Sequence, residues 1–107
     1  MNYNFDENDI IQEIYNSYLD KNNWQLELKE VLLEIVIYNN DENINEIIDL
    51  YGGSYHLCNL YNNKYKNLIN INDTNISYYS LLAFIGLYNS IYDKILEKIV
   101  MDFSLNI

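Results

Sequence analysis

Apolar residues recur every three or four positions along most of the chain, which is the spacing of one face of an α-helix. Over the first two thirds of the sequence this pattern predicts four helices, at about residues 7–21, 24–38, 41–51 and 55–69. Paired polar residues separate the first three helices, and Gly52 is placed to end the third in the left-handed conformation. Ser54 is placed to cap the fourth helix.

The remaining third of the chain predicts one loop and one long helix. Residues 70–75, rich in Asn and Asp, predict the one sizeable loop. A last helix then starts at Asn75 or Ser77, because apolar residues keep the helical spacing for about seven turns. These residues are Leu81, Ile85, Tyr88, Tyr92, Ile95, Leu96, Ile99 and Phe103. The predicted fold is all-α, a single compact domain over residues 1–107 with about five helices and a long C-terminal one.

Charge is distributed very unevenly along the sequence. The chain has 16 acidic residues, six lysines and no arginine, for a net charge of −10, which is the wrong sign for gripping phosphates. We therefore expect no direct binding of nucleic acid. The first 53 residues hold twelve of the acids and two of the lysines, so the whole net charge lies in that half.

The acids of this half follow helical spacing and form three stripes away from the apolar faces. The first stripe is Asp6, Asp9 and Glu13, the second is Glu27, Glu30 and Glu34, and the third is Glu42, Glu46 and Asp49. A single stripe is most often an ordinary solvated face. Three stripes on the same side of the molecule would instead create a negative surface potential of several kT, which attracts a cationic partner. We expect such a partner-binding surface, with Tyr38 and Tyr55 beside the acids because tyrosine is favoured at interfaces.

The residues that carry catalytic or metal chemistry are few. His56 and Cys58 occur once each and stand about 200° apart on a helix, so they can neither share a metal nor act as a nucleophile and base. Cys58 is expected in the core and His56 at the surface. The step from Gly52 to Ser54 lacks the further glycine and the lysine of a phosphate-binding loop. We expect no enzyme, no cofactor, no metal and no small-molecule substrate.

The cellular location is expected to be cytoplasmic. The longest uncharged apolar stretch, residues 76–92, is interrupted by polar residues and falls short of a membrane span of about 20 apolar residues. The first nine residues are acidic and polar, unlike a signal peptide, and a lone cysteine fits a reducing compartment. No membrane partner is expected.

In its size, acidity and asparagine-rich helical composition, the whole chain resembles the immunity proteins of contact-dependent growth inhibition and of colicin-like toxin systems. The resemblance implies a protein that binds and neutralises a cationic toxin domain, expected to be a nuclease, with carboxylates standing in for phosphates. Two alternatives stay open. One is a phage-encoded inhibitor that mimics nucleic acid and blocks a host defence nuclease, and the other is a helical adaptor that binds through an apolar groove.

Overall fold

The structure, a computed structural model, describes residues 6–39, 41–66 and 76–105, which are all-α. The helices are α1 (Glu7–Leu19), α2 (Trp24–Tyr38), α3 (Asp41–Tyr51), α4 (Ser54–Leu60) and α5 (Tyr78–Leu105), and a π-helical segment, η1 (Tyr61–Tyr65), continues α4. The predicted helical bundle with a long C-terminal helix is confirmed. The predicted loop at 70–75 and the predicted end of the fourth helix at 67–69 lie outside the described residues.

Polar side chains fix the starts of the first two helices. The Asp6 carboxylate accepts a hydrogen bond from the backbone N–H of Asn8, with 2.9 Å between nitrogen and oxygen, and the Asn23 amide oxygen accepts one from Leu26 over 3.2 Å. These bonds satisfy N–H groups that have no partner within a helix. Asp6 therefore has a structural role as the cap of α1, in addition to its place in the first stripe.

Two glycines, Gly52 and Gly53, connect α3 to α4. Gly52 has φ +128°, a backbone conformation open to glycine, and it ends α3 as predicted. The residue that precedes α4 is Gly53, and no side chain caps this helix. The prediction that Ser54 caps the fourth helix is therefore wrong, because Ser54 is already the first residue of that helix.

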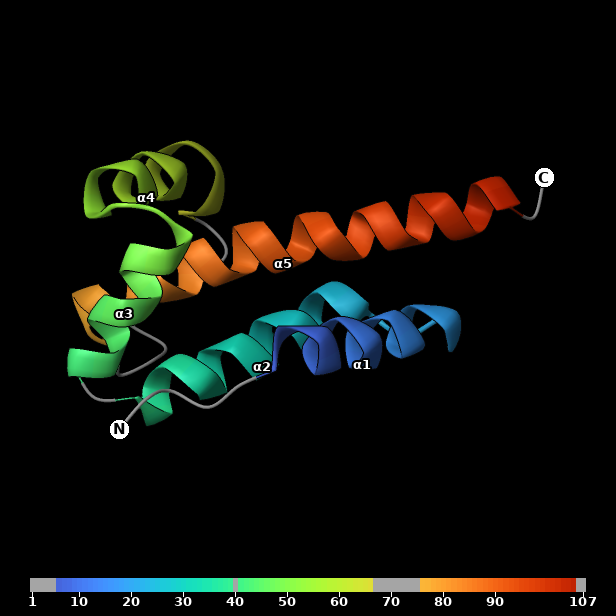
Figure 1. Cartoon of the computed structure of the whole chain (residues 1–107), viewed down its shortest axis with the longest axis horizontal. Coiled ribbons are helices and arrows are strands. Elements are labelled where there is room, and N and C mark those ends of the chain that lie inside the picture. The colour runs from blue at the N-terminus through green and yellow to red at the C-terminus, as the bar shows by residue number, and fades with distance from the viewer. Residues whose placement is uncertain (1–5, 40, 67–75, 106–107) are drawn as a thin grey trace.

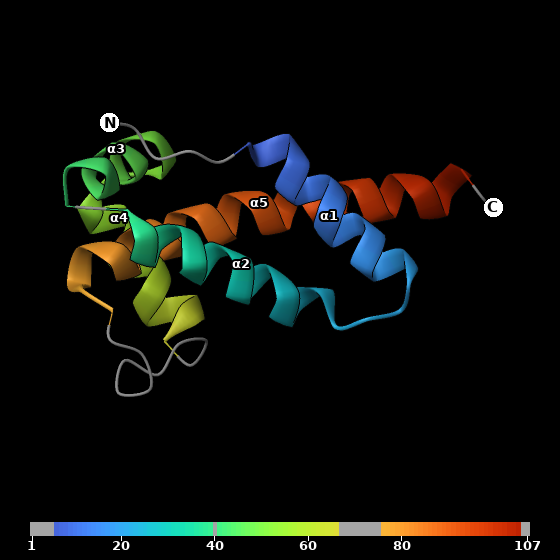
Figure 2. The same ribbon diagram turned by 90° about the horizontal axis from the view of Figure 1, so that it is seen from below.

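Helix α5 is the central element, against which every other helix packs. In Figure 1, α4 lies above its first turns, while α1 and α2 lie side by side below it. In the view from below, α1 and α2 form a layer in front of α5 (Figure 2). Helix α3 crosses near the start of α5, where a Cβ on Gly86 would come within 2.9 Å of the Tyr51 Cβ. The glycine therefore permits the close approach of α3 and α5.

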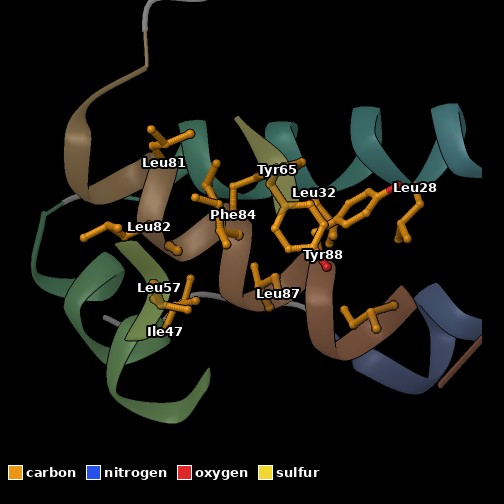
Figure 3. Packing of buried hydrophobic residues seen from close by; sticks show 14 of the residues in the cluster. Leu28, Leu32, Ile47, Leu57, Tyr65, Leu81, Leu82, Phe84, Leu87 and Tyr88 are labelled. Carbon is orange, nitrogen blue, oxygen red and sulfur yellow. The ribbon is translucent and has the colours of Figure 1, made fainter. Parts of the chain in front are cut away.

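The core is built around the first half of α5, in which residues 80–88 are all buried. Figure 3 shows side chains from α2, α3, α4 and η1 converging on this segment. Phe84 and Tyr88 lie at the centre, with ring centroids 5.5 Å apart, and Tyr65 meets Tyr88 edge to face at 5.8 Å. Burial raises the pKa of Tyr88 to about 12, since the charged phenolate loses its hydration there.

The last turns of α5 reach beyond the bundle (Figure 1). Leu96 and Phe103, predicted on the inward stripe of this helix, are exposed, and Phe103 retains 64% of its accessible surface. The periodicity predicted the helix correctly, but in its second half the side of α5 that packs against the core carries Ile95 and Ile99, and Leu96 and Phe103 lie outside that side. Within the described residues, no helix has both the length and the apolar character needed to cross a membrane.

Candidate functional site

Two of the three acidic stripes lie on one layer of the molecule. Helices α1 and α2 lie side by side on α5 and bury their apolar faces against it and against each other. Asp6, Asp9 and Glu13 of the first stripe are exposed, as are Glu30 and Glu34 of the second, while Glu27 is half-buried. Since α5 covers the inner side of the layer, these carboxylates lie on its outer part, which faces solvent.

Two lysines of α5, Lys94 and Lys98, contact α1 and fix its orientation. Lys98 donates a hydrogen bond to the Gln12 amide oxygen at 2.9 Å and lies 4.7 Å from the centre of the Tyr15 ring. At 100° per residue, Asp9 and Glu13 lie roughly 120° and 160° around α1 from Tyr15. Asp9 and Glu13 therefore lie on a different side of α1 from the ring that Lys98 contacts, and neither forms an ion pair with a lysine in the described structure.

In the described structure, nearby lysines do not neutralise the carboxylates of the first two stripes. Within the described part of the chain, the lysine–carboxylate ion pair is that of Lys94 with Glu7, and Glu7 belongs to none of the three stripes. No described acid of the stripes forms an ion pair with a lysine. The two lysines on α5 thus serve the packing of α1, and the stripe carboxylates keep their negative charge available.

The third stripe lies on a different part of the molecule. Helix α3 is outside the α1–α2 layer, near the start of α5 (Figure 1), and its Glu46 and Asp49 are exposed. The side chain of Glu42 lies outside the described part of the structure. The structure thus brings the first and second stripes together on one layer and leaves the third apart from them.

Both tyrosines assigned to the surface are strongly exposed. Tyr38, the last residue of α2, and Tyr55, in the first turn of α4, each retain 82% of their accessible surface. Tyr38 lies on the same helix as the second stripe. Tyr55 lies on α4, across α5 from the layer (Figure 1), so it is not beside the first two stripes.

His56 and Cys58 lie on α4 in different surroundings. His56 is exposed, and within the described residues no group of three or more His, Cys, Asp or Glu is placed to hold a metal ion. Cys58 packs against the core but is only half-buried, and its Sγ shares a 2.8 Å hydrogen bond with the Tyr78 hydroxyl. This hydrogen bond, together with desolvation, raises the pKa of Tyr78. Cys58, expected in the core, thus packs against it from the rim, where the start of α5 supplies Tyr78 as its neighbour.

A shallow groove of about 340 Å³ between α1 and the end of α5 escaped the sequence analysis. Tyr15, Met101 and Leu105 supply its apolar lining, and Lys94, Glu97, Lys98 and Asp102 its charged rim. Desolvation and a hydrogen bond from the Tyr15 hydroxyl to Asp102 raise the pKa of Tyr15. No local sequence signal marks this groove, since its two walls are more than 75 residues apart in the chain.

Comparison with protein-family models, with curated proteins and with solved structures finds no match to this chain. The features that bear on function are the acidic stripes of the α1–α2 layer and the groove between α1 and α5.

Proposed function

We propose that the chain is an immunity-type inhibitor, which binds a cationic toxin domain through the outer side of the α1–α2 layer and thereby neutralises it. The toxin is expected to be a nuclease, whose substrate-binding surface must be basic to hold a polyanion. The observation that supports this function most strongly is the presence of two acidic stripes on one layer without lysine partners in the described structure.

Repulsion between the neighbouring carboxylates of these two stripes destabilises the helices, which suggests that the stripes have a function. Like charges at helical spacing destabilise a helix by about 0.2–0.5 kcal/mol per pair. Glu30 and Glu34 form such a pair on α2, and Asp9 and Glu13 form another on α1. A surface needed for solvation alone would be served by mixed charges, whereas an acidic one raises the rate of encounter with a basic partner by about 10- to 1,000-fold.

The adaptor alternative has one observation in its favour, the groove between Tyr15 of α1 and Met101 and Leu105 of α5. An adaptor would bind an apolar segment there, and its association rate would depend little on salt. The nucleic-acid mimic uses the same acidic surface as the immunity protein and differs in its target. An immunity gene lies directly beside the gene of its toxin, whereas a mimic is encoded among phage genes.

The proposed function is tested with the product of the reading frame that precedes this gene. That product is assayed for nuclease activity on RNA and on DNA, alone and with increasing amounts of this chain. We expect complete loss of activity at one equivalent, together with a 1:1 complex in size-exclusion chromatography. Undiminished activity and no complex at tenfold excess would contradict the proposal.

Two double charge reversals locate the effect. Glu30→Lys with Glu34→Lys alters the second stripe, and Asp93→Lys with Glu97→Lys alters an exposed i, i+4 pair on α5. Each double variant changes the net charge from −10 to −6. We expect the α2 variant to lose inhibition and the α5 variant to retain it. Equal inhibition by both variants would exclude the second stripe from the interface.

A further inference from the structure

Exposed apolar side chains run beside the second stripe on α2. Leu26 and Ile37 retain 48% and 56% of their accessible surface, and between them lies Leu33, which is partly buried. These three residues are seven and four positions apart and therefore follow one line along the helix. A helix that packs by one face alone would present polar residues along such a line.

The apolar line and the acids are direct neighbours. Glu30 lies four positions after Leu26 and three before Leu33, and Glu34 lies three before Ile37, which are the separations at which helical side chains meet. We name this surface the α2 outer face and define it as Leu26, Glu30, Leu33, Glu34 and Ile37. It is about 17 Å long at 1.5 Å per residue, enough for about three turns of a second helix.

The other stripes have different surroundings. Around Asp9 and Glu13 of α1, the exposed neighbours are polar, and Gln12 and Asn16 hydrogen-bond to each other over 2.9 Å. On α3, Leu50 is the single large apolar side chain exposed beside Glu46 in the described structure. Among the three stripes, the second thus has an apolar row along its length.

We infer that the α2 outer face is the contact centre of the proposed interface and takes a basic amphipathic helix of the partner. The partner's apolar residues would lie on Leu26, Leu33 and Ile37, and its Lys or Arg residues would lie opposite Glu30 and Glu34. Interfaces draw most of their affinity from a buried apolar centre, while charges at the edge mainly set the association rate. This inference rests on the proposed function and assigns its affinity to α2.

Charge complementarity favours a basic helix over a second copy of the chain or a nucleic acid as the partner that binds the α2 outer face. A second copy of the chain would carry another −10 and, in a symmetric α2–α2 pair, would bring Glu30 and Glu34 of both copies together. A nucleic acid would add further negative charge. A basic helix neutralises the carboxylates and covers the apolar row at the same time.

The test uses a fluorescein-labelled synthetic peptide of Leu and Lys, with leucines at three- and four-residue spacing so that it forms a basic amphipathic helix. Its binding is measured by fluorescence anisotropy. Leu26→Ser with Ile37→Ser removes the exposed apolar row, and Leu96→Ser with Val100→Ser, whose side chains retain 38% and 59% of their accessible surface, removes two exposed apolar residues from α5 as the matched control. Circular dichroism verifies that each variant keeps its helices.

We expect the α2 serine variant to bind the peptide at least tenfold more weakly than wild type and the α5 control to bind within twofold of it. A peptide of the same composition in scrambled order should also bind at least tenfold more weakly. If Glu30→Lys with Glu34→Lys abolishes binding while the α2 serine variant binds like wild type, the inference is wrong and the acidic surface of the proposed function stands. If neither α2 variant changes binding, the inference is wrong and the second stripe does not bind the peptide. An equal loss in the α5 control would place the site elsewhere and overturn the inference.

Discussion

The Lys94 ammonium of α5 pairs with the Glu7 carboxylate in the first turn of α1, so two residues 87 positions apart in the sequence hold α1 against α5. One turn further along α5, Lys98 reaches Gln12 and the Tyr15 ring. These contacts fix the rotation of α1, and in the described structure Asp9 and Glu13 of its acidic stripe form no ion pair with either lysine. The negative surface of the layer thus depends on how α1 sits on α5.

The energy of the Lys94–Glu7 pair is expected to be small. Both side chains are partly exposed, and pairs of this kind contribute about 0.2–1 kcal/mol. A double-mutant cycle with Lys94→Met and Glu7→Gln, measured by urea unfolding, should give a coupling free energy below about 1 kcal/mol, lower still in high salt. Lys66→Met, which breaks no ion pair in the described structure, is the control. A coupling free energy above about 2 kcal/mol would show that the pair is far more important for stability than its exposure indicates.

A methyl group on Gly86 should force α3 and α5 apart. The new Cβ of Gly86→Ala would lie 2.9 Å from the Tyr51 Cβ and 3.4 Å from the Tyr51 carbonyl oxygen, and neither atom is at the flexible end of a side chain. Overpacking of this kind costs about 1–3 kcal/mol, partly offset by about 1 kcal/mol from the better helix propensity of alanine.

We therefore expect Gly86→Ala to lower the free energy of unfolding by about 1 kcal/mol in urea denaturation. Gly53→Ala is the matched control, since its Cβ would meet nothing within 4 Å and its φ of −76° suits any residue. That variant should stay within about 0.5 kcal/mol of wild type. A stabilised Gly86→Ala protein would show that the two helices are not in close contact at this point.

Stability should fall in alkaline solution because of Tyr88. Its pKa is about 12 in the folded protein against 10.0 for an ordinary tyrosine, chiefly because the side chain is buried. Below pH 10 the hydroxyl is protonated in both states. Between pH 10 and 12 it ionises in the unfolded chain alone, so this contribution to stability is lost as the pH rises to the folded-state pKa.

A shift of this size amounts to about 2 kcal/mol at pH 12. Tyr88→Phe keeps the packing on Phe84 and Tyr65 and should make the free energy of unfolding decline less steeply between pH 10 and 12 than in wild type. Urea unfolding at several pH values, followed by circular dichroism, measures this decline. Identical slopes in the two proteins would mean that Tyr88 ionises at its ordinary pKa when folded.

Much of the fold could be predicted from sequence because local chemistry determines it. The helices at 24–38 and 41–51 and the left-handed Gly52 follow from apolar spacing, polar breaks and the conformational freedom of glycine. Ser54 shows the limit of such rules, because α4 begins one residue earlier than predicted and Ser54 is therefore its first residue and not its cap.

The errors arose where distant segments decide the outcome. The apolar spacing of Leu96 and Phe103 cannot show that the side of α5 that packs against the core carries Ile95 and Ile99 instead. Likewise, no local signal places Tyr78 against Cys58, or Lys94 and Lys98 against α1. The acidic stripes themselves were readable, but only the packing of the helices on α5 shows that two of them share a layer and the third does not.

The most direct test of the acidic interface is the salt dependence of association between this chain and the proposed toxin partner, measured by stopped-flow fluorescence. At low ionic strength, the Glu30→Lys, Glu34→Lys variant should associate at least tenfold more slowly than the Asp93→Lys, Glu97→Lys variant, although both carry a net charge of −6. This difference should shrink towards 1 M salt, where the Debye length falls to about 3 Å. Equal association rates of the two variants at every ionic strength would contradict the assignment of the α1–α2 layer as the docking surface.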